Sequence, residues 1–365
     1  MRILAIDIGT GTQDILYFDA SRPIENCIKL IMPSPTMIAA RRIERAARAG
    51  RAVVLTGSNS GGGPCAWAVD ECLKSGGTVF ATPSAAETFN DDLSAVEEWG
   101  VRLVSEDEIR GINGERITLR DLDVDAIATA LRAFEEPFEP DGWAVACLDH
   151  GAAPPDVSDR LFRFDHLRRT LEGDDDLRAF AMRPEELPEY MTRARALTAH
   201  AEGLGRVAFM DTGPAAALGA IEDPAMRDKD ERVVVNLGNM HLLGFHLRGT
   251  RVASLMEHHT GEVDAETIAQ MVRRLADGSL THDEVFNTKG HGAHHHDRGI
   301  VRPGLPGDVA VTGPQRGKIR ETGLPHYAAA PHGDMMLSGC FGLLRGFGRC
   351  YPDAAEAIQH RLGTL

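Results

Sequence analysis

A short turn of glycine and threonine near the start of the chain has the composition of a phosphate-binding loop. An apolar run from Ile3 to Ile8 is followed by Gly9-Thr10-Gly11-Thr12, and a second apolar run covers Ile15 to Phe18. Glycine lets backbone N–H groups approach an anion closely because no Cβ intervenes. Asp7, at the end of the first run, could hold a hydrated Mg²⁺ ion beside the turn. The simpler alternative is an ordinary hairpin with a Gly-Thr turn.

A second group with chemical potential is the pair Asp149 and His150, which follows the buried strand predicted for Ala144 to Leu148. Open α/β sheets bind ligands beyond the carboxyl ends of their strands. A carboxylate at that place could take a proton from a substrate hydroxyl as a general base. His150 could orient Asp149, bind the substrate or ligate a metal. The alternative for Asp149 is a structural cap of the following turn.

Two further segments are candidates for substrate binding. Thr56 to Gly63 is a Gly/Ser-rich loop between a short strand and a helix, and a helix N-terminus behind such a loop can bind an anion. The loop is not a Walker motif, because it has no GK[ST], and a flexible linker is the alternative. Asp334 could face a cleft or simply cap the last helix. The predicted substrate contacts are Ser58, Asn59, Gly61, Gly62, His332 and Asp334.

Histidines are concentrated in the second half of the chain. His258 and His259 end a predicted strand, and His291, His294, His295, His296 and Asp297 lie in a predicted loop at residues 287–308. Imidazole and carboxylate are normal ligands of Zn²⁺, Fe²⁺ and Ni²⁺, so a transition-metal site is one hypothesis. The alternative is adventitious binding by neighbouring histidines in a loop.

The amino-acid composition limits the classes of protein to which the chain can belong. The chain has 365 residues, 43% of them hydrophobic, which is enough for two packed domains. A net charge of −15 argues against nucleic-acid binding and against anionic membranes. The sequence shows neither a membrane-length apolar stretch nor a signal-peptide pattern at its start, so we expect a cytoplasmic protein. Six cysteines without a CxxC pair predict reduced thiols.

The elements that must position these residues alternate between strands and helices, which predicts an α/β protein with buried parallel strands. A second hairpin, predicted for Val233 to Leu247, matches the first in pattern. In each hairpin a polar residue, Asp7 or Asn236, stands two positions before a glycine. This repetition predicts two pseudo-equivalent halves, each with its own phosphate hairpin. The last strong helix is predicted at Met335 to Phe347.

The chain resembles the actin-like ATPase superfamily, which includes sugar kinases, actin and heat-shock chaperones. Five segments occur in the order that this superfamily uses, and together they span most of the chain. They are the first hairpin at Asp7–Gly11, a connecting helix at Asp211–Ala220, the second hairpin at Asn236–Asn239, an adenosine-side turn at Val311–Pro314 and a final connecting helix from Gly333 to Gly342.

The resemblance implies a two-lobed, ribonuclease H-like α/β fold with a cleft between the lobes, at residues 1–205 and 206–365, with a peripheral insertion at about 154–205. It also implies ATP and Mg²⁺ as cofactors. Asp7 would be the Mg²⁺ ligand, and it would be a catalytic residue in addition to Asp149 and His150. The chain departs from the superfamily pattern at Asn236, where Asp is common, and at Pro314, where a second glycine is usual. The implied nucleotide contacts are Gly9, Thr10, Gly11, Thr12, Gln13, Asn236, Gly238, Asn239, His241, Gly313 and Gln315.

More narrowly, the phrases LTGSNSGGGP, DTGPAAALGAI and HGDMMLSGCFGLL resemble a family sometimes labelled pyruvate formate-lyase activating enzyme. The cysteine pattern CxxxCxxC that a radical activating enzyme needs is absent, so we reject that activity. The leading hypothesis is a phosphotransferase that acts on a small polar acceptor. The alternatives are an ATP-driven activator or chaperone of a partner enzyme, and a metal-dependent group transferase that uses the histidines. A homodimer is left open.

Overall fold

Two six-stranded sheets form the centres of two lobes. The structure is a computed structural model, and it describes residues 1–296 and 309–365. The first sheet contains β1 (Arg2–Ile8), β2 (Thr12–Asp19), β3 (Ile28–Pro33), β8 (Gly142–Cys147), β9 (Ala181–Met182) and β10 (Arg206–Asp211). The second contains β11 (Glu231–Leu237), β12 (His241–Arg248), β13 (Arg251–His259), β14 (Gly292–His295), β15 (Val309–Thr312) and β16 (His326–Ala328).

The two sheets share one local topology. Their strand orders are β3-β2-β1-β8-β10-β9 and β14-β13-β12-β11-β15-β16. In each, an antiparallel meander of three strands is extended, beside its first strand, by two parallel strands. This duplicated arrangement agrees with the two-lobed fold that the resemblance implied, and it confirms the predicted α/β fold class and both predicted hairpins.

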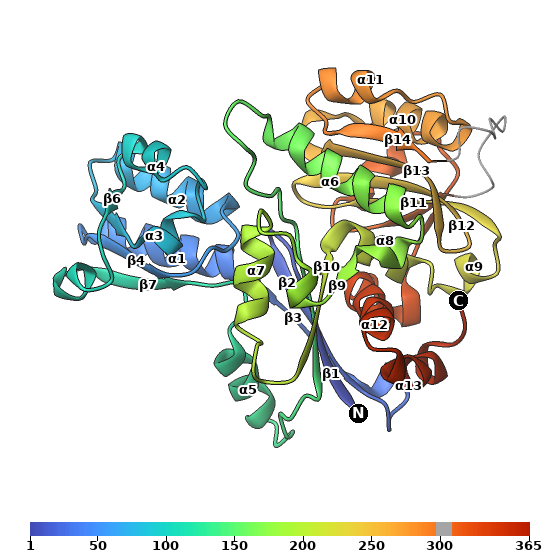
Figure 1. Cartoon of the computed structure of the whole chain (residues 1–365), viewed down its shortest axis with the longest axis horizontal. Coiled ribbons are helices and arrows are strands. Elements are labelled where there is room, and N and C mark those ends of the chain that lie inside the picture. Colours follow the sequence, from blue (N-terminus) through green and yellow to red (C-terminus); the bar gives the residue numbers. More distant parts are fainter. Residues whose placement is uncertain (297–308) are drawn as a thin grey trace.

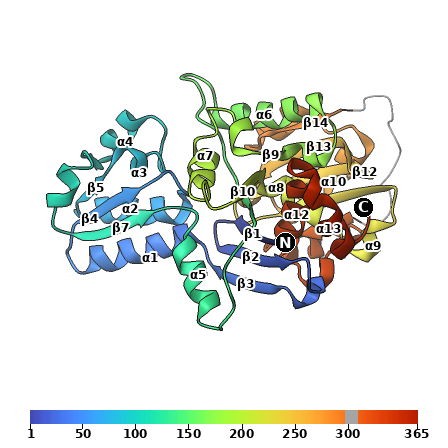
Figure 2. The same ribbon diagram turned by 60° about the horizontal axis from the view of Figure 1, so that its bottom comes forward.

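A third, wholly parallel sheet lies between β3 and β8 in the chain. It has the order β6-β5-β4-β7 and is inserted into the first lobe. Figures 1 and 2 show it to one side of the two large sheets, with helices around it. Its elements are α1 (Pro35–Arg48), β4 (Val53–Gly57), α2 (Gly63–Lys74), β5 (Val79–Ala81), α3 (Pro83–Ala86), α4 (Leu93–Trp99), β6 (Arg102–Leu103) and β7 (Glu115–Leu119).

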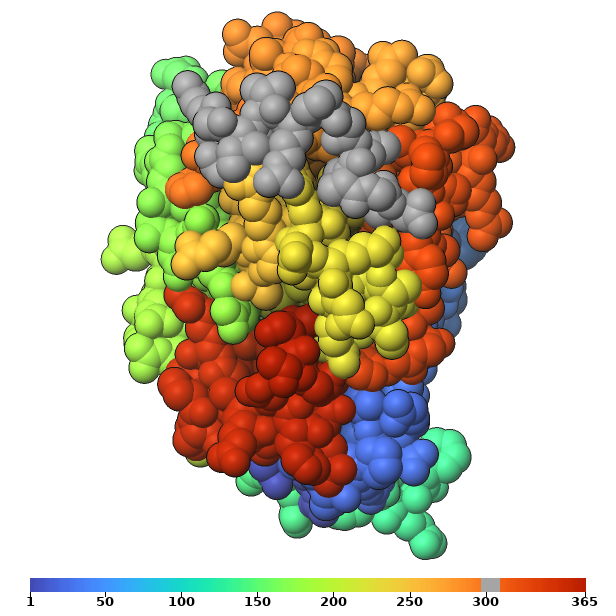
Figure 3. Space-filling model, turned by 90° about the vertical axis from the view of Figure 1, so that its right-hand side faces the viewer, coloured from blue at the N-terminus to red at the C-terminus, as the bar shows by residue number. Residues whose placement is uncertain are grey.

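The remaining helices cover or join the two large sheets. Figure 3 shows the C-terminal segment, in red, beside the start of the chain, in blue. A hydrogen bond of 2.7 Å from the Arg361 Nε to the carbonyl of Ala20 joins these segments. These helices are α5 (Val124–Arg132), α6 (Asp159–Gly173), α7 (Thr192–Ala199), α8 (Thr212–Ala220), α9 (Pro224–Arg227), α10 (Ala265–Asp277), α11 (His282–Asn287), α12 (Ser338–Cys350) and α13 (Pro352–Leu362).

The core is divided by the alternation of side chains along the strands. On β1, Ile3 and Ala5 face a cluster that also contains Phe245 of the second lobe and Phe341 of α12. Leu4 and the other alternate residues of β1 face a separate cluster beneath α5 and α7. One hydrophobic cluster therefore runs through both lobes, with α8 and α12 between the sheets.

The two connecting helices cross at close range because small residues meet there. A Cβ on Gly219 of α8 would lie well inside contact distance of the Ser338 carbonyl, and a Cβ on Gly342 of α12 would do the same to the Ala215 carbonyl. Backbone atoms form both obstacles, so no side-chain rotation can relieve the overlap. The small residues from which the two connecting helices were predicted therefore also allow these helices to cross closely between the lobes.

We expect Gly342→Ala to lower the free energy of unfolding by about 1–3 kcal/mol, the usual cost of overpacking. Chemical denaturation would measure it. The matched control is Gly173→Ala in α6, where an added Cβ meets nothing within 4 Å and the helix propensity favours alanine. Equal stability of the two variants would contradict the tight crossing.

Three local predictions need correction. The last helix begins at Ser338 rather than Met335 and continues to Cys350, and the further helix α13 was missed although Pro352 marks its first turn. Within the predicted loop at 287–308, residues Gly292–His295 form β14, because they pair with β13. Asp297 lies outside the described residues.

Candidate functional site

One cavity of about 950 Å³ collects most of the residues that the sequence singled out. Its walls come from both hairpin turns, the Gly/Ser-rich loop, the segment after β8 and the start of α12. Predicted residues that line it are Asp7, Gly9, Thr10, Thr12, Asn59, Gly61, Gly62, Asp149, His150, Asn236, Gly238, Asn239, His241, His259 and Gly313.

The two hairpin turns have the same closure and face each other. Gly9 donates its N–H to the carbonyl of Thr12, and Gly238 donates its N–H to the carbonyl of His241, each at 2.9 Å. A Cβ on Gly11 would lie 2.8 Å from the Asn239 Nδ2, which places the turns in contact. The structure thus brings together two matching glycine turns from distant parts of the chain, in the wall of one cavity.

A pair of carboxylates lies on the strands below the first turn. Asp7 and Asp14 stand opposite each other in the β1–β2 register, and both line the cavity. The Thr212 hydroxyl donates to Asp7 at 2.5 Å, whereas the Asp14 Oδ1 is buried without a hydrogen-bond partner among the described residues. Like charges directly opposite on a sheet are destabilising unless a cation or protons compensate them.

Burial accounts for the electrostatics of this pair. It raises the pKa of Asp7 to about 7, against the lowering effect of the Thr212 hydroxyl. Burial, followed by the charge of Asp7, raises the pKa of Asp14 to about 8. Asp14 was missed from the sequence, although counting the hairpin register across the Gly9–Thr12 turn places it opposite Asp7. Two carboxylates with an unsatisfied oxygen are suitable ligands for a hydrated Mg²⁺ ion.

The Gly/Ser-rich loop is held by hydrogen bonds rather than free. Gly61 donates its N–H to Asp121 at 3.0 Å, and the Arg193 Nε donates to the same carboxylate at 2.7 Å. Asn59 donates to the Thr192 hydroxyl at 3.1 Å. The loop therefore has a fixed shape at the cavity wall, which does not fit a flexible linker.

Asp149 is buried and held at both carboxylate oxygens. It accepts the N–H of Gly151 and the N–H of Ala194, each at 2.8 Å. Burial raises its pKa above the usual range despite these bonds. The next residue, His150, is exposed to the cavity but surrounded by its walls, and desolvation followed by the nearby His241 lowers its pKa well below the usual value. The predicted general base is thus in the cavity, in a fixed orientation.

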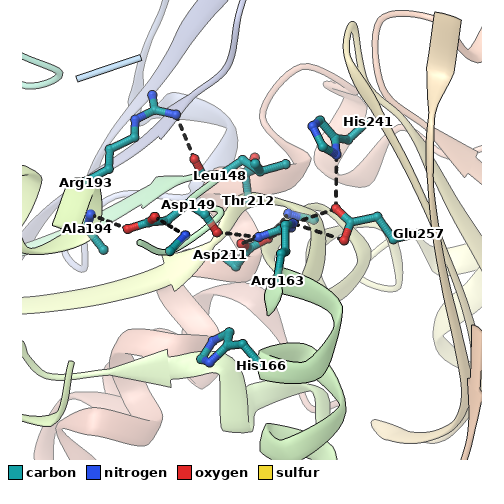
Figure 4. Close-up of polar contacts among 12 residues, drawn as sticks. Leu148, Asp149, Arg163, His166, Arg193, Ala194, Asp211, Thr212, His241 and Glu257 are labelled. Atoms are coloured by element: carbon teal, nitrogen blue, oxygen red, sulfur yellow. Dashed lines mark hydrogen bonds and ion pairs between the residues drawn. The ribbon is translucent and has the colours of Figure 1, made fainter. Parts of the chain in front are cut away.

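A buried arginine that no sequence motif marks connects the two lobes next to Asp149 and His241 (Figure 4). Arg163, on α6, donates through its Nε to Glu257 of the second lobe at 2.8 and 3.0 Å. Its Nη1 donates at 2.8 Å to Asp211 and to the carbonyl of Asp149. Glu257 also accepts a hydrogen bond from the Nδ1 of His241 at 3.2 Å. The stretch predicted to be a peripheral insertion therefore supplies a central contact of the site.

The histidines are arranged differently from the predicted loop cluster. Ligand atoms of His150, His241 and His291 lie within 4.8 Å of one another. The His259 ring lies 4.6 Å from the His291 ring. Burial lowers the pKa of His291 to about 3, so its imidazole is neutral at neutral pH.

The other predicted metal ligands lie elsewhere. The Nε2 of His258 lies 3.2 Å from the Thr288 hydroxyl, and His295 contacts the Ser254 hydroxyl and donates to the Leu280 carbonyl. The rings of His294 and His296 lie beside each other with their centres 6.3 Å apart, and neither residue lines the cavity. Of the six predicted metal ligands, all within the described residues, only His259 and His291 have rings beside those of His150 and His241.

Several predicted contacts do not line the cavity. Gln13 donates to the Pro33 carbonyl at 3.0 Å, and Ser58 lies 2.9 Å from the His200 Nε2. Gln315 donates to the Asn239 side chain at 3.1 Å, so it supports the second turn from behind. His332 packs on Phe341. Asp334 accepts the N–H of Met336 at 3.1 Å in the turn before α12, whose N-cap residue is Leu337, so Asp334 does not cap the last helix.

None of the helices in the described ranges combines the length and hydrophobicity that a membrane crossing requires. The six cysteines carry no disulfide, and five of them are buried. No cysteine is among the residues that line the cavity in the described part of the chain.

Several solved structures resemble this chain at low sequence identity. The ROK hexokinase from Thermus thermophilus is 16% identical over 69% of this chain and 47% of its own, with a TM-score of 0.22, so the chain spans less than half of that enzyme. The inorganic polyphosphate/ATP-glucomannokinase from Arthrobacter sp. strain KM is 14% identical over 98% and 99%, with a TM-score of 0.37. Component A of (R)-2-hydroxyglutaryl-CoA dehydratase from Acidaminococcus fermentans is 10% identical over 95% and 99%, with a TM-score of 0.29.

No curated protein sequence is significantly similar to the chain. The fold therefore stands on the strand order and the paired hairpins described above. A family model, in contrast, matches residues 60–318, which is well over half of the sequence. The chain belongs to the family described as "Putative pyruvate format-lyase activating enzyme (DUF1786)".

Proposed function

We propose that this protein is a Mg²⁺- and ATP-dependent enzyme that transfers a phosphoryl group to a small polar acceptor in the cavity. The observation that carries the proposal is the pair of matching glycine turns, in contact through Gly11 and Asn239, above two buried carboxylates. Turns with free backbone N–H groups suit phosphate oxygens. Carboxylates with an unsatisfied oxygen suit a hydrated divalent cation.

The residues present fit a Mg²⁺–nucleotide complex at this place. Asp7 and Asp14 would hold the ion, and the turns at Gly9–Thr12 and Gly238–Asn239 would hold the phosphates. When bound, the ion and nucleotide supply an electrophilic phosphoryl group. The Thr212 hydroxyl fixes the orientation of Asp7 through its 2.5 Å hydrogen bond.

The acceptor side of the cavity lies next to Asp149, His150 and Arg160. Asp149 is the proposed general base, since each of its oxygens accepts only one backbone N–H and keeps capacity for a second hydrogen bond. The guanidinium of Arg160, held by the carbonyls of Phe286 and Gly290, offers a positive charge to an anionic acceptor. The cavity volume of about 950 Å³ can hold a nucleotide and a small second substrate together.

We expect Asp149→Asn to lower acceptor-dependent ATP turnover by about 10²–10⁴-fold, the usual contribution of a general base. The assay is ATP turnover with a panel of small hydroxy and carboxylate compounds, after calorimetry of ATP and ADP with and without Mg²⁺. Nucleotide affinity should be almost unchanged in this variant, because the carboxylates below the turn are intact. Gln13→Ala, on the first hairpin, is the control for turnover, because Gln13 is bonded to the Pro33 carbonyl and is not among the residues that line the cavity.

Three outcomes would contradict the proposal at different levels. Absence of Mg²⁺-dependent nucleotide binding would overturn all of it. Nucleotide binding with slow turnover that responds to a protein partner, and to no small acceptor, would replace the phosphotransferase with an ATP-driven activator. Full turnover in Asp149→Asn would restrict Asp149 to a structural cap.

A further inference from the structure

Four imidazole rings from separate segments meet beside the acceptor side of the cavity. His150 follows β8, His241 begins β12, His259 ends β13 and His291 precedes β14. The ring of His241 lies 5.1 Å from that of His150 and 4.9 Å from that of His291. Polar groups gathered from two lobes into one place require a physical reason, because apolar packing alone would not select them.

His291 has no solvent-accessible surface, and neither of its ring nitrogens has a hydrogen-bond partner among the described residues. A buried imidazole normally satisfies at least one nitrogen, and an exception calls for an explanation such as an ion. The ring is instead directed toward the nitrogens of His150 and His241, whose ligand atoms lie within 4.8 Å of it.

The surrounding hydrogen bonds fix the tautomers of two of the four rings: His241, which is one of the ligands proposed below, and the neighbouring His259. The Nδ1 of His241 lies 3.2 Å from the Glu257 carboxylate, which can only accept, so the Nε2 keeps its lone pair. His259 donates its Nδ1–H to the Lys289 carbonyl at 2.8 Å, with the same consequence. Such outer partners commonly fix the tautomer and orientation of histidines that bind metals.

The buried part of the local charge favours a cation over an anion. The buried Arg163 is paired with two carboxylates, Asp211 and Glu257, which leave one net negative charge. Arg160, whose guanidinium is held by the Gly290 carbonyl beside His291, is only partly buried, so solvent screens its positive charge more strongly. An anion placed among the imidazoles would lie next to Glu257, whereas a cation would be attracted to it.

We propose that His150, His241 and His291 bind a divalent transition-metal ion of the Zn²⁺, Co²⁺, Fe²⁺ or Ni²⁺ class, with an open coordination position toward the cavity. Three protein ligands and an open position are the usual form of a catalytic zinc site, and imidazole suits this class of metals. Tetrahedral coordination at about 2.1 Å needs nitrogens roughly 3.4 Å apart, so the rings must move slightly inward. His150, on the cavity surface, leaves room for a substrate oxygen at the remaining position.

The test is metal binding by the full-length chain, purified without an affinity tag. Metal content per chain is measured by mass spectrometry, and Co²⁺ is titrated into chelator-treated protein while its visible d–d absorption is followed. We expect one metal per chain in the wild type. We expect at least a 100-fold loss of Co²⁺ affinity in His291→Ala and in His150→Ala, and no change in the control His294→Ala.

The controls separate this site from its alternatives. His150 is exposed to the cavity, so His150→Ala reports on the ligand set even if the buried His291→Ala fails to fold. A wild-type protein without stoichiometric metal, or one that loses its metal in His294→Ala but keeps it in His291→Ala, would overturn the proposal. Inorganic phosphate binding that His291→Ala abolishes, in the absence of Co²⁺ binding, would also overturn it. Because no nucleotide is needed, the result is independent of the proposed phosphotransferase activity.

Discussion

Arg163→Met is expected to lower the free energy of unfolding by about 3–5 kcal/mol, the cost of removing one partner from a buried ion pair. The Arg163 side chain has no solvent-accessible surface, and neither does that of Glu257. Its other partner, Asp211, is only 3% exposed. Methionine fills a similar volume but leaves two buried carboxylates without a counter-charge, and it leaves the Asp149 carbonyl without its donor.

Urea denaturation of the variant and the wild type would measure this difference. The matched control is Arg168→Met on the same helix, because Arg168 is 39% exposed and pairs with the partly exposed Asp165 and the exposed Glu172. Solvent-exposed pairs contribute about 0–1 kcal/mol, so the control should remain close to the wild type. Similar losses in both variants would show that α6 responds to any lost arginine, and not to the buried network.

The same substitution has a consequence at the site. Arg163 holds Glu257, and Glu257 holds the ring of His241. Arg163 also holds Asp211, whose side chain caps the start of α8 by accepting the N–H of Gly213. Arg163 is therefore a positioning residue that does not itself line the cavity. We expect Arg163→Met to disturb the cavity residues of both lobes.

Much of the fold could be predicted from the sequence because its signals are local. An apolar run, a glycine turn and a second apolar run define each hairpin, and the small residues of α8 and α12 mark a close helix crossing. The topology then follows, since both hairpins extend in the same way. Strand β14 escaped prediction because its four residues form a strand only through their pairing with β13.

The parts of the site that escaped prediction depend on contacts between distant segments. Arg163 is one of four arginines in α6, and nothing in their local sequence distinguishes the buried one from Arg160, Arg168 or Arg169. His291 looked like one more histidine of a loop, whereas its neighbours in space are His150 and His241. Asp14 is different, because its position opposite Asp7 could have been counted from the hairpin alone.

Asp14→Asn is expected to have opposite effects on activity and on the stability of the metal-free protein. Removing one of two carboxylates that face the proposed Mg²⁺ should lower Mg²⁺-dependent ATP turnover by roughly 10²–10⁴-fold, the equivalent of several kcal/mol of lost metal assistance. Asp7→Asn should lose at least as much, because Asp7 is also the residue that the Thr212 hydroxyl orients. Asp107→Asn, at an exposed side chain far from the cavity lining, is the control.

The stability of the same variant, measured without metal, should depend on pH in a defined direction. Burial and the charge of Asp7 raise the pKa of Asp14 to about 8, so the folded state binds this proton more tightly than the unfolded chain does. The stability contributed by the protonated form is therefore present at low pH and is lost as the pH rises from about 4 through 8. Asparagine does not ionise, so in thermal unfolding Asp14→Asn should match the wild type more closely at pH 5 and exceed it in melting temperature at pH 9. Addition of Mg²⁺ at pH 9 should stabilise the wild type and leave the variant almost unchanged, because only the wild type offers the complete carboxylate pair. A wild type that is equally stable at both pH values, and unaffected by Mg²⁺, would show that the two carboxylates do not form a cation site.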